Sequence, residues 1–391
     1  MLIFPFLEGH MNYSVALHSP KEKFYHRIEN LLSLAGVELN GNRPWDIHVH
    51  NDKFYFTVVR SGSLGLGESY MNSWWDAAQV DELICRLLKA ELDTKVNSPQ
   101  DVMFYLGALM FNLQSPERSY EVGRKHYDIG NDLYKHMLDR RMIYSCAFWK
   151  NASTLDEAQE AKLDLVCRKL ELKPGMRVLD IGCGWGGLAQ FAAKNYGVSV
   201  MGVTISKEQA TLAMERCQGL PVEIRLQDYR AINDTFDRIV SLGMFEHVGY
   251  KNYRIFMSKV HDLLKKEGLF LLHTIGSNVS RKTIDCWIHK YIFPNSMLPS
   301  AKQITRSIEG IFVLEDWHNF GADYDKTLMH WFENFRNSWN ILKKNYDDRF
   351  FRMWKYYLLS CAGSFRARSN QLWQIVLSPK GIPGGYRAHY K

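Results

Sequence analysis

The chain has 391 residues, of which 46% are hydrophobic, and this length and composition predict two packed domains. Its formal net charge is +7, which favours an anionic partner such as a phospholipid surface or a nucleic acid, although composition alone fits ordinary solubility better. The seven cysteines are scattered and form no Cys-x-x-Cys pair, which indicates a reducing compartment and excludes the common zinc-site patterns. No apolar run approaches eighteen residues, so any membrane contact is expected to be peripheral.

Residues 1–110 predict a small, mainly helical domain. Apolar side chains recur at helical spacing over 24–35, which predicts an amphipathic helix. Two short strands are predicted after it, at Ile47–His50 and Phe54–Val59. A further amphipathic helix is predicted at Val80–Leu92.

A glycine-rich stretch, Gly62–Trp75, has the composition of a ligand-binding loop. No buried strand leads its glycines into a helix at phosphate-binding spacing, so it predicts a turn before a helix that bears Trp74 and Trp75, with core packing favoured over ligand contact. A proline and polar residues then place a linker at 111–122 and leave 123–391 as the second domain.

The second domain contains a strand, a glycine turn and a helix in immediate succession. Residues 178–181 suit a buried parallel strand, and Gly182, Gly184 and Gly186 lead into the helical pattern over 188–194. Such glycines let the backbone pass close under a ligand, and the helix N-terminus adds partial positive charge. The stretch predicts a site for an adenosine-type cofactor.

The next strand decides between cofactors. A dinucleotide site favours an acidic residue at the end of the second strand, whereas Val198–Val203 runs into Thr204-Ile205-Ser206, so NAD is disfavoured. The pattern Val178–Gly186 instead resembles motif I of class I S-adenosylmethionine methyltransferases. A purely structural turn and another nucleotide remain as alternatives.

Strand and helix patterns alternate through the rest of the chain. Thr154 with Glu157 three residues later predicts a capped helix. Further strands are predicted at Val198–Val203, Val222–Leu226, Phe236–Leu242, Leu269–Ile275, Ile311–Leu314 and Leu372–Leu377. The predicted fold class is α/β, a Rossmann-like domain with a mostly parallel seven-stranded sheet, whose ligands sit at the carboxyl ends of the strands.

A Glu-His pair, Glu246 and His247, follows the predicted strand Phe236–Leu242. The pair is compatible with an acid/base dyad, with metal ligands or with a hydrogen-bonded structural pair. Adjacent residues lack the i, i+4 spacing of helical metal ligands, so no metal site is expected.

Seven motifs, taken in order, resemble those of bacterial cyclopropane-fatty-acyl-phospholipid synthases. The resemblance runs from about residue 20 to about residue 378 and includes Gly62–Trp75. The seven motifs are Tyr144–Trp149, Val178–Gly187, Gly202–Gln209, Gly243–Gly249, Leu272–Gly276, Glu315–Tyr324 and Tyr357–Ala367.

This resemblance implies that S-adenosylmethionine donates a methylene across the cis double bond of an unsaturated acyl chain in a membrane phospholipid. A carbocation then loses a proton to a bound bicarbonate ion, because a freely charged carboxylate or thiolate beside the cation would trap it. The implied bicarbonate cage is Cys146, Glu246, His273, the backbone of Ile275, and Tyr324. Glu246 would accept the hydroxyl hydrogen of bicarbonate, while His273 and Tyr324 donate to its oxygens.

The resemblance also implies a set of cofactor-binding residues: Tyr144, Ser145, Gly182, Gly184, Thr204, Gln209, Asp228 and Tyr229. Cys361 is a further candidate for the catalytic site. A role in the core or in the lining of the pocket is favoured over a nucleophile, because no histidine motif accompanies Cys361.

The expected setting is a cytoplasmic, peripheral enzyme at the inner face of the membrane, a homodimer with no nucleic-acid partner. The N-terminal domain is expected to dock on the bilayer, and Arg140 and Arg141 either meet lipid headgroups or form a solvated face. The dense aromatic residues over 317–357 are expected to divide between core and acyl tunnel. Alternatives are a methyltransferase that leaves a methylated, non-cyclised lipid or methylates a small amine, and a non-catalytic binding protein of the same fold.

Overall fold

The computed structural model describes residues 20–92 and 130–388. The predicted linker at 111–122 lies outside these residues. The helices are α1 (Pro20–Leu34), α2 (Lys53–Met71), α3 (Val80–Lys89), α7 (Asn131–Met137), α8 (Leu155–Lys169), α9 (Gly187–Tyr196), α10 (Lys207–Arg216), α11 (Tyr253–Leu263), α12 (Cys286–Tyr291), α13 (Ala301–Ile308), α14 (Ala322–Asn337), α15 (Trp339–Leu342) and α16 (Asp348–Arg366), with 3-10 turns η1 (Tyr229–Ala231) and η2 (Phe245–His247). The strands are β1 (His48–Val49), β2 (Trp75–Asp76), β3 (Arg177–Ile181), β4 (Ser199–Thr204), β5 (Val222–Leu226), β6 (Phe236–Leu242), β7 (Leu264–Ser277), β8 (Val313–Asn319) and β9 (Asn370–Ser378).

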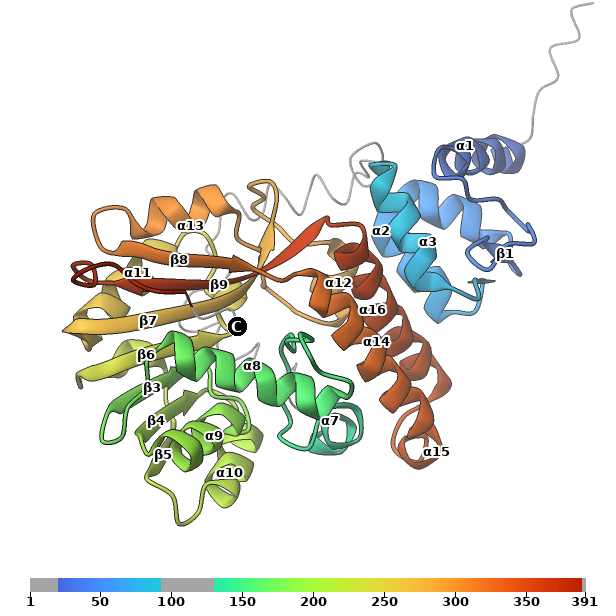
Figure 1. Ribbon diagram of the computed structural model, residues 1–391. Coiled ribbons are helices and arrows are strands. Elements are labelled where there is room, and N and C mark those ends of the chain that lie inside the picture. Colours follow the sequence, from blue (N-terminus) through green and yellow to red (C-terminus); the bar gives the residue numbers. More distant parts are fainter. Residues whose placement is uncertain (1–19, 93–129, 389–391) are drawn as a thin grey trace, which may run out of the picture.

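A seven-stranded sheet organises the larger part of the molecule (Figure 1). Its strand order is β5-β4-β3-β6-β7-β9-β8, and β9 runs antiparallel to both of its neighbours while the other pairs are parallel. The chain extends the sheet from β3 to β5 on one side and then returns to place β6 on the other side. The predicted mostly parallel α/β sheet is confirmed, and its topological switch point lies between β3 and β6.

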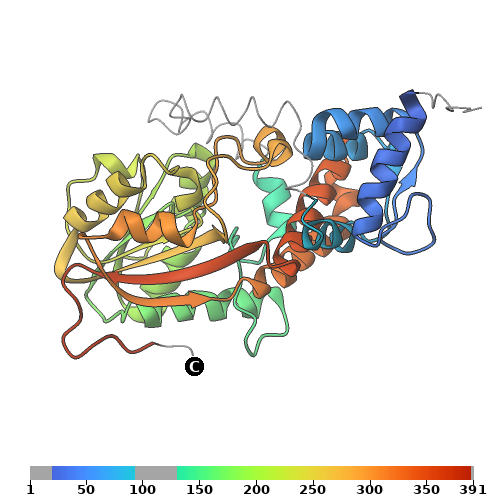
Figure 2. The same ribbon diagram turned by 90° about the horizontal axis from the view of Figure 1, so that it is seen from above.

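Helices cover both faces of the sheet because successive strand residues point to opposite sides. Val178 and Val240 pack with α8 and α9 in one core cluster, whereas Leu179 and Ile239 pack with α11 and α13 in another. Figure 2 shows the two helical layers on either side of the strands. The alternation makes the central strands β3 and β6 largely apolar on both faces, whereas β5 and β8 at the edges are partly exposed.

A second group of helices, α2, α3, α12, α14 and α16, packs beside the sheet and is called the helical layer here (Figure 1). Tyr70 and Trp75 share one hydrophobic core with Trp287, Trp354 and Tyr356. The rings of Trp287 and Tyr356 lie 4.7 Å apart, and those of Tyr70 and Tyr356 lie 5.4 Å apart. The N-terminal residues are therefore held by a continuous aromatic core, and a boundary at residue 110 remains a prediction.

Most predicted elements of the larger domain are found with small shifts in their ends. β5 and β6 have the predicted limits, whereas β8 begins at Val313 and continues to Asn319. The Thr154 hydroxyl accepts a hydrogen bond from the Glu157 N–H at 3.3 Å, and the Glu157 carboxylate accepts from the Thr154 N–H at 3.2 Å. The predicted capping box at the start of α8 is therefore confirmed.

The N-terminal predictions are correct for α1 and α3 and wrong for α2. The predicted strand Phe54–Val59 belongs to this helix. Its Tyr55 ring lies 5.4 Å from Tyr25 and its Phe56 ring 5.5 Å from Phe24, both on α1. Packing against α1 outweighs the strand preference of these aromatic and β-branched residues. The strand predicted at Ile47–His50 is present but shortened to β1.

The turn predicted within Gly62–Trp75 is also wrong, because α2 passes through the glycines and ends at Met71. Gly62 alone interrupts the helix, with φ of 54°. At Gly65 an added Cβ would lie 2.3 Å from the Thr57 carbonyl oxygen, and at Gly67 one would lie 2.4 Å from the Trp287 ring. These two glycines therefore serve close packing and not a turn.

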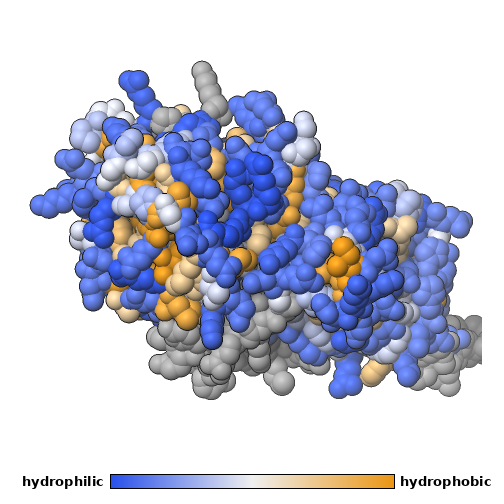
Figure 3. Space-filling view, turned by 90° about the horizontal axis from the view of Figure 1, so that it is seen from below, coloured by the Kyte–Doolittle hydropathy of each residue, from blue (hydrophilic) through white to orange (hydrophobic). Residues whose placement is uncertain are grey.

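The surface seen in Figure 3 is mostly hydrophilic, with its apolar side chains in separate patches. Across 20–92 and 130–388, no helix combines the length and the apolar character needed to cross a bilayer. All seven cysteines are free thiols.

Candidate functional site

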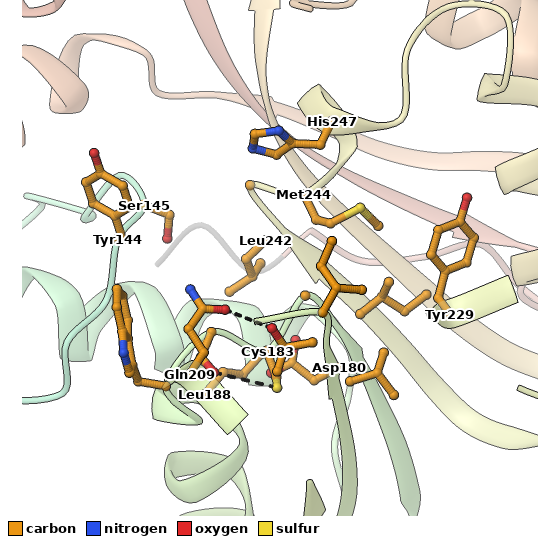
Figure 4. A pocket seen from close by; sticks show the side chains of 18 of the residues that line it. Tyr144, Ser145, Asp180, Cys183, Leu188, Gln209, Tyr229, Leu242, Met244 and His247 are labelled. Atoms are coloured by element: carbon orange, nitrogen blue, oxygen red, sulfur yellow. Dashed lines mark hydrogen bonds between the residues drawn. The ribbon is translucent and has the colours of Figure 1, made fainter. Parts of the chain in front are cut away.

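A cavity of about 200 Å³ opens at the carboxyl ends of β3, β4 and β6, at the switch point of the sheet (Figure 4). Its walls come from the glycine loop after β3 and from the segments that follow β4, β5 and β6. The structure brings together at this cavity all eight residues predicted to bind a cofactor: Tyr144, Ser145, Gly182, Gly184, Thr204, Gln209, Asp228 and Tyr229.

The glycine loop brings bare backbone to the cavity. Gly182 and Gly184 have φ of 82° and 53°, in the region that side-chain-bearing residues rarely adopt. A Cβ at Gly182 would lie 2.8 Å from the Cβ of Met244, which follows β6. The loop therefore needs glycine both for its conformation and for its approach to the β6 end of the sheet.

Polar side chains on the β4 and β5 side of the cavity are held by local hydrogen bonds. Thr204 Oγ1 donates to Gln209 Oε1 at 2.8 Å, so the Gln209 amide nitrogen points away from Thr204 (Figure 4). Arg230 Nε donates to Asp228 Oδ1 at 2.9 Å. Burial opposes ionisation of Asp228, but the hydrogen bonds and charge of Arg230 outweigh it and lower the carboxyl pKa. Asp228 is thus an anion on the cavity wall.

Two buried residues of α8 hold the segment that covers the cavity. Lys162 Nζ donates to Ser145 Oγ at 2.9 Å, and Gln159 Nε2 donates to the Ser145 carbonyl oxygen at 2.9 Å. Burial lowers the pKa of Lys162 to about 8 and raises that of Asp180 to about 7. Tyr144 is held from the opposite side, because its hydroxyl lies 2.8 Å from that of Tyr357 on α16.

Neither α8 residue was among the predicted site residues, although the sequence contains a signal. Gln159, Lys162 and Lys169 lie at helical spacing on the same face as Leu155 and Val166, and all five are buried. A lysine on the apolar stripe of an amphipathic helix is unusual unless it has a buried partner. The position of Lys162 in the pattern was therefore a recognisable signal of a polar site.

Glu246 lies just beyond the cavity, on η2 after β6. Its Oε1 accepts a hydrogen bond from the Ile275 N–H at 2.7 Å, while its Oε2 is buried with no hydrogen-bond partner within residues 20–92 and 130–388. Burial raises the pKa of Glu246 to about 7, although the Ile275 N–H opposes the shift. Two residues before Ile275 on β7, His273 is 1% exposed, and its Nε2 also has no hydrogen-bond partner in the described part of the chain. The structure therefore joins Glu246 to the Ile275 backbone, two residues along β7 from His273.

Cys146 and Tyr324 are placed by α14. Cys146 is fully buried, and its Sγ lies 4.0 Å from Thr327 Oγ1. Burial and the charge of Asp323 raise the thiol pKa well above its usual value, so the thiol is neutral. Tyr324 lies one turn before Thr327 and packs against Phe365, with ring centroids 4.6 Å apart.

His247 and Cys361 are the two remaining candidates. His247 lines the cofactor cavity, whereas its neighbour Glu246 bonds the Ile275 backbone, so the two adjacent side chains do not form an acid/base pair with each other. Burial lowers the pKa of His247 to about 4. Cys361 lies on α16, does not line the cofactor cavity, and has its thiol pKa raised to about 12 by burial. Its proposed catalytic role remains a prediction.

Comparisons with known proteins agree with this geometry. The family model "Mycolic acid cyclopropane synthetase" matches residues 114–375. The cyclopropane-fatty-acyl-phospholipid synthase of Escherichia coli (strain K12) is 56% identical over 369 residues, which cover 94% of this chain and 96% of that protein. The chain belongs to the cyclopropane synthase family.

More distant family members support the same fold. A probable fatty acid methyltransferase of Pseudomonas putida is 39% identical over 265 residues, covering 64% of this chain and 67% of its own. The cyclopropane synthase MmaA2 from Mycobacterium tuberculosis matches with a TM-score of 0.62 and 32% identity, covering 66% of this chain and 97% of that one. A structure of the mycolic acid cyclopropane synthase CmaA1, complexed with SAH and CTAB, matches with a TM-score of 0.62 and 31% identity, covering 66% of this chain and 97% of that one. The predicted Rossmann-like methyltransferase fold is confirmed, and the chain is an enzyme of the S-adenosylmethionine-dependent methyltransferase class.

Proposed function

We propose that this enzyme is a cyclopropane-fatty-acyl-phospholipid synthase. It transfers a methylene group from S-adenosylmethionine to the cis double bond of an unsaturated acyl chain in a membrane phospholipid. The observation that carries this proposal is the 56% identity to the Escherichia coli protein of that name, which extends over almost the whole of both chains. The convergence of the eight predicted cofactor residues on one cavity supports it.

The cavity fits S-adenosylmethionine in the chemistry of its walls. When bound, this cofactor supplies an electrophilic methyl group on a sulfonium. The backbone of Gly182 and Gly184 forms a cradle without side chains, and α9 starts immediately behind it with its N-terminal N–H groups. Gln209 and Asp228 add polar groups on one side, and Ser145 closes the other.

Bicarbonate is proposed as the base, bound between Glu246 and His273. A buried polar atom without a partner costs about 1–3 kcal/mol. Within residues 20–92 and 130–388, Glu246 Oε2 and His273 Nε2 are two such atoms, and Glu246 is bonded to Ile275, two residues from His273, which supports a small polar ligand between them. When bound, bicarbonate supplies a weak base close to the reacting carbon. Glu246 Oε2 accepts the hydroxyl hydrogen of that ligand, and His273 Nε2 donates to one of its oxygens.

Two further residues complete the proposed surroundings of the base. The Ile275 N–H already donates to Glu246 Oε1, so its part in the cage is to hold the carboxylate in place. The neutral thiol of Cys146 is a poor nucleophile and does not trap a cationic acyl chain. A dry site with a held weak base therefore favours loss of a proton and ring closure over covalent capture.

The test is mass spectrometry of phospholipid vesicles incubated with the enzyme, S-adenosylmethionine and bicarbonate. The proposal predicts lipids heavier by about 14 mass units that have lost their double bond and that form only with added bicarbonate. Lipids heavier by the same mass with the double bond retained would instead identify a methyltransferase that leaves a non-cyclised product. Absence of any lipid product would move the assignment to a small amine substrate.

Peripheral docking on the inner face of the membrane is proposed to use α1 and α2. Leu34 and Phe56 are 60% and 49% exposed, and the Arg60 guanidinium lies 5.9 Å from the Phe56 ring. Aromatic and basic groups side by side suit the headgroup region of an anionic bilayer. Arg140 and Arg141 instead both bond Glu160, at 2.9 and 2.7 Å. Arg140 is 62% exposed, which favours its alternative role on a solvated face, whereas Arg141 is only 17% exposed.

Vesicle co-sedimentation tests the docking surface. Phe56→Ser is expected to lower binding about threefold, whereas Ile255→Ser, which removes a 60% exposed side chain from α11, leaves it unchanged. An equal loss in both variants would contradict docking through α1 and α2. The homodimer is a separate proposal, and analytical ultracentrifugation of the full chain tests it.

A further inference from the structure

A polar row crosses the three strands β7, β9 and β8. His273 on β7 is the register partner of Gln374 on β9, and Gln374 is in turn the register partner of His318 on β8. Gln374 is fully buried, and its Nε2 lies 3.3 Å from His273 Nδ1. A buried amide in the middle of a sheet is costly unless it has a partner. The contact with His273 supplies one at Nε2, whereas Gln374 Oε1 has no hydrogen-bond partner among the residues that the structure describes.

His273 carries a single ring proton. Burial, together with the charges of Lys162 and Lys169, lowers its pKa well below the usual value. A neutral imidazole has one N–H donor and one bare nitrogen, and the hydrogen bond at one nitrogen decides which is which. The partner of Nδ1 therefore sets the state of Nε2, the ring atom that has no hydrogen-bond partner among the described residues.

The amide of Gln374 presents its nitrogen to His273. An amide nitrogen donates, so Nδ1 accepts and the ring proton lies on Nε2. The reverse orientation would present an amide oxygen, draw the proton to Nδ1 and leave a lone pair on Nε2. A lone pair there would repel an oxyanion, whereas an N–H binds it.

Charged groups at the β8 end of the row also favour the neutral form of His273. Lys169 is fully buried, and its Nζ lies 3.1 Å from His318 Nδ1 and 3.4 Å from Asp316 Oδ2. An ammonium can only donate, so His318 accepts at Nδ1 and is neutral as well. The nearby positive charge opposes a second proton on His273, so the ring stays in one neutral form.

We propose that Gln374 is a positioning residue that fixes His273 as the Nε2–H tautomer, so that His273 donates a hydrogen bond to an anionic oxygen base. The inference rests on the proposed function for the identity of that anion. Its structural part, the position of the ring proton, stands independently of turnover.

Nitrogen-15 NMR of histidine-labelled full-length enzyme tests the structural part directly. The His273 signals are assigned by their loss in His273→Asn. The proposal predicts a protonated Nε2 and an unprotonated, hydrogen-bonded Nδ1 in the wild type, and in Gln374→Glu a proton drawn to Nδ1. A wild-type spectrum with the proton on Nδ1 overturns the proposal whether or not the enzyme makes cyclopropane lipids.

Steady-state kinetics on vesicles test the role in the reaction. Gln374→Met keeps the side-chain volume but removes the donor, and we expect the apparent KM for bicarbonate to rise about tenfold while the KM for S-adenosylmethionine changes less than about twofold. Gln371→Met is the matched control, since Gln371 is buried on the same strand and bonds Asn319. An unchanged KM for bicarbonate in Gln374→Met, or an equal rise in Gln371→Met, overturns the proposal.

The two arms separate this inference from the proposed function. A wild-type enzyme with the proton on Nε2 but no cyclopropane product supports the tautomer and refutes the proposed reaction. An active wild-type enzyme with the proton on Nδ1 refutes the tautomer and supports the proposed reaction.

Discussion

The cofactor cavity draws its residues from loops at the ends of neighbouring strands, whereas the helical layer joins residues that lie nearly three hundred positions apart. The cavity depends on backbone conformation at Gly182 and Gly184 and on short local hydrogen bonds such as that between Thr204 and Gln209. The helical layer depends on contacts such as that between Arg366 and Asp81, separated by 285 positions.

This difference separates two ways in which the enzyme can fail. Changes at the strand ends should impair cofactor binding or chemistry while the fold stays intact. Changes in the helical layer should lower stability, because that layer ties the N-terminal helices to the end of the chain. Glu246 belongs to the strand ends, and Cys146 and Tyr324 depend on α14, so the proposed cage lies where the two regions meet.

The largest effect is expected from Glu246→Gln, which keeps the size of the side chain but removes its carboxylate. We expect turnover on vesicles to fall by about 10²–10⁴-fold, the usual contribution of a positioned acid or base, with S-adenosylmethionine affinity by calorimetry unchanged. Glu267→Gln, at an exposed position on the same strand that carries His273, is the control and should be fully active. Loss of cofactor binding in Glu246→Gln would show that the cage and the cavity are not separable.

Arg366→Met tests the helical layer. Arg366 joins Asp81 on α3 at 2.7 Å and Asp325 on α14 at 2.9 Å, so its loss leaves two carboxylates without their partner. We expect the free energy of unfolding in urea to fall by about 2 kcal/mol, less than for a fully buried pair because Arg366 is 30% exposed. Arg336→Met removes an exposed pair with Glu333 and should cost less than about 0.5 kcal/mol. An equal loss of unfolding free energy in the two variants would contradict the role of Arg366 in joining α16 to α3 and α14.

Lys162→Met tests the support of the cavity from behind. The substitution removes the hydrogen bond to Ser145 Oγ and the positive charge close to Asp180. We expect the Kd for S-adenosylmethionine to rise about tenfold by calorimetry, the effect of one hydrogen bond from a charged donor. Lys169→Met removes another buried lysine of α8 that has no contact with the cavity, and it should leave the Kd unchanged. A similar rise in both variants would point to a general disturbance of α8.

An effect of similar size is expected in the pH dependence that arises from Glu246. Its pKa is raised to about 7, so the carboxyl is increasingly protonated below that pH and cannot accept the bicarbonate hydrogen. With cofactor saturating and free bicarbonate held constant, kcat should rise about tenfold between pH 6 and pH 8. The residual activity of Glu246→Gln should lack this rise. A wild-type kcat that is flat over the range, or that falls as pH rises, would contradict the role of Glu246.

The sequence predicts the sheet better than the helical layer for a physical reason. β5 alternates apolar and charged residues, β6 is mostly apolar, both are bounded by turn residues, and the glycine turn after β3 has a local pattern. The helix α2 cannot be predicted from its own residues. Gly65 and Gly67 pack against Thr57 and Trp287, and Trp287 lies close to them only in the folded chain.

The candidate site divides in the same way. Local motifs and the family resemblance predict the residues that line the cavity. The residues that hold them, Lys162, Gln159, Thr327 and Gln374, come from other helices and strands and become visible only through their contacts. Of these, the two on α8 had a sequence signal, since polar side chains occupy a stripe that is otherwise apolar.

The most direct test of the account uses S-adenosylmethionine whose methyl group carries deuterium in place of hydrogen. Ring closure transfers the methyl carbon and gives up one of its deuterium atoms to the base, so the vesicle lipids should gain about 16 mass units. Replacement of an alkene hydrogen by an intact methyl group would add about 17. A gain of about 16 with loss of the double bond is the predicted result, and a gain of about 17 with the double bond retained would contradict the proposed synthase.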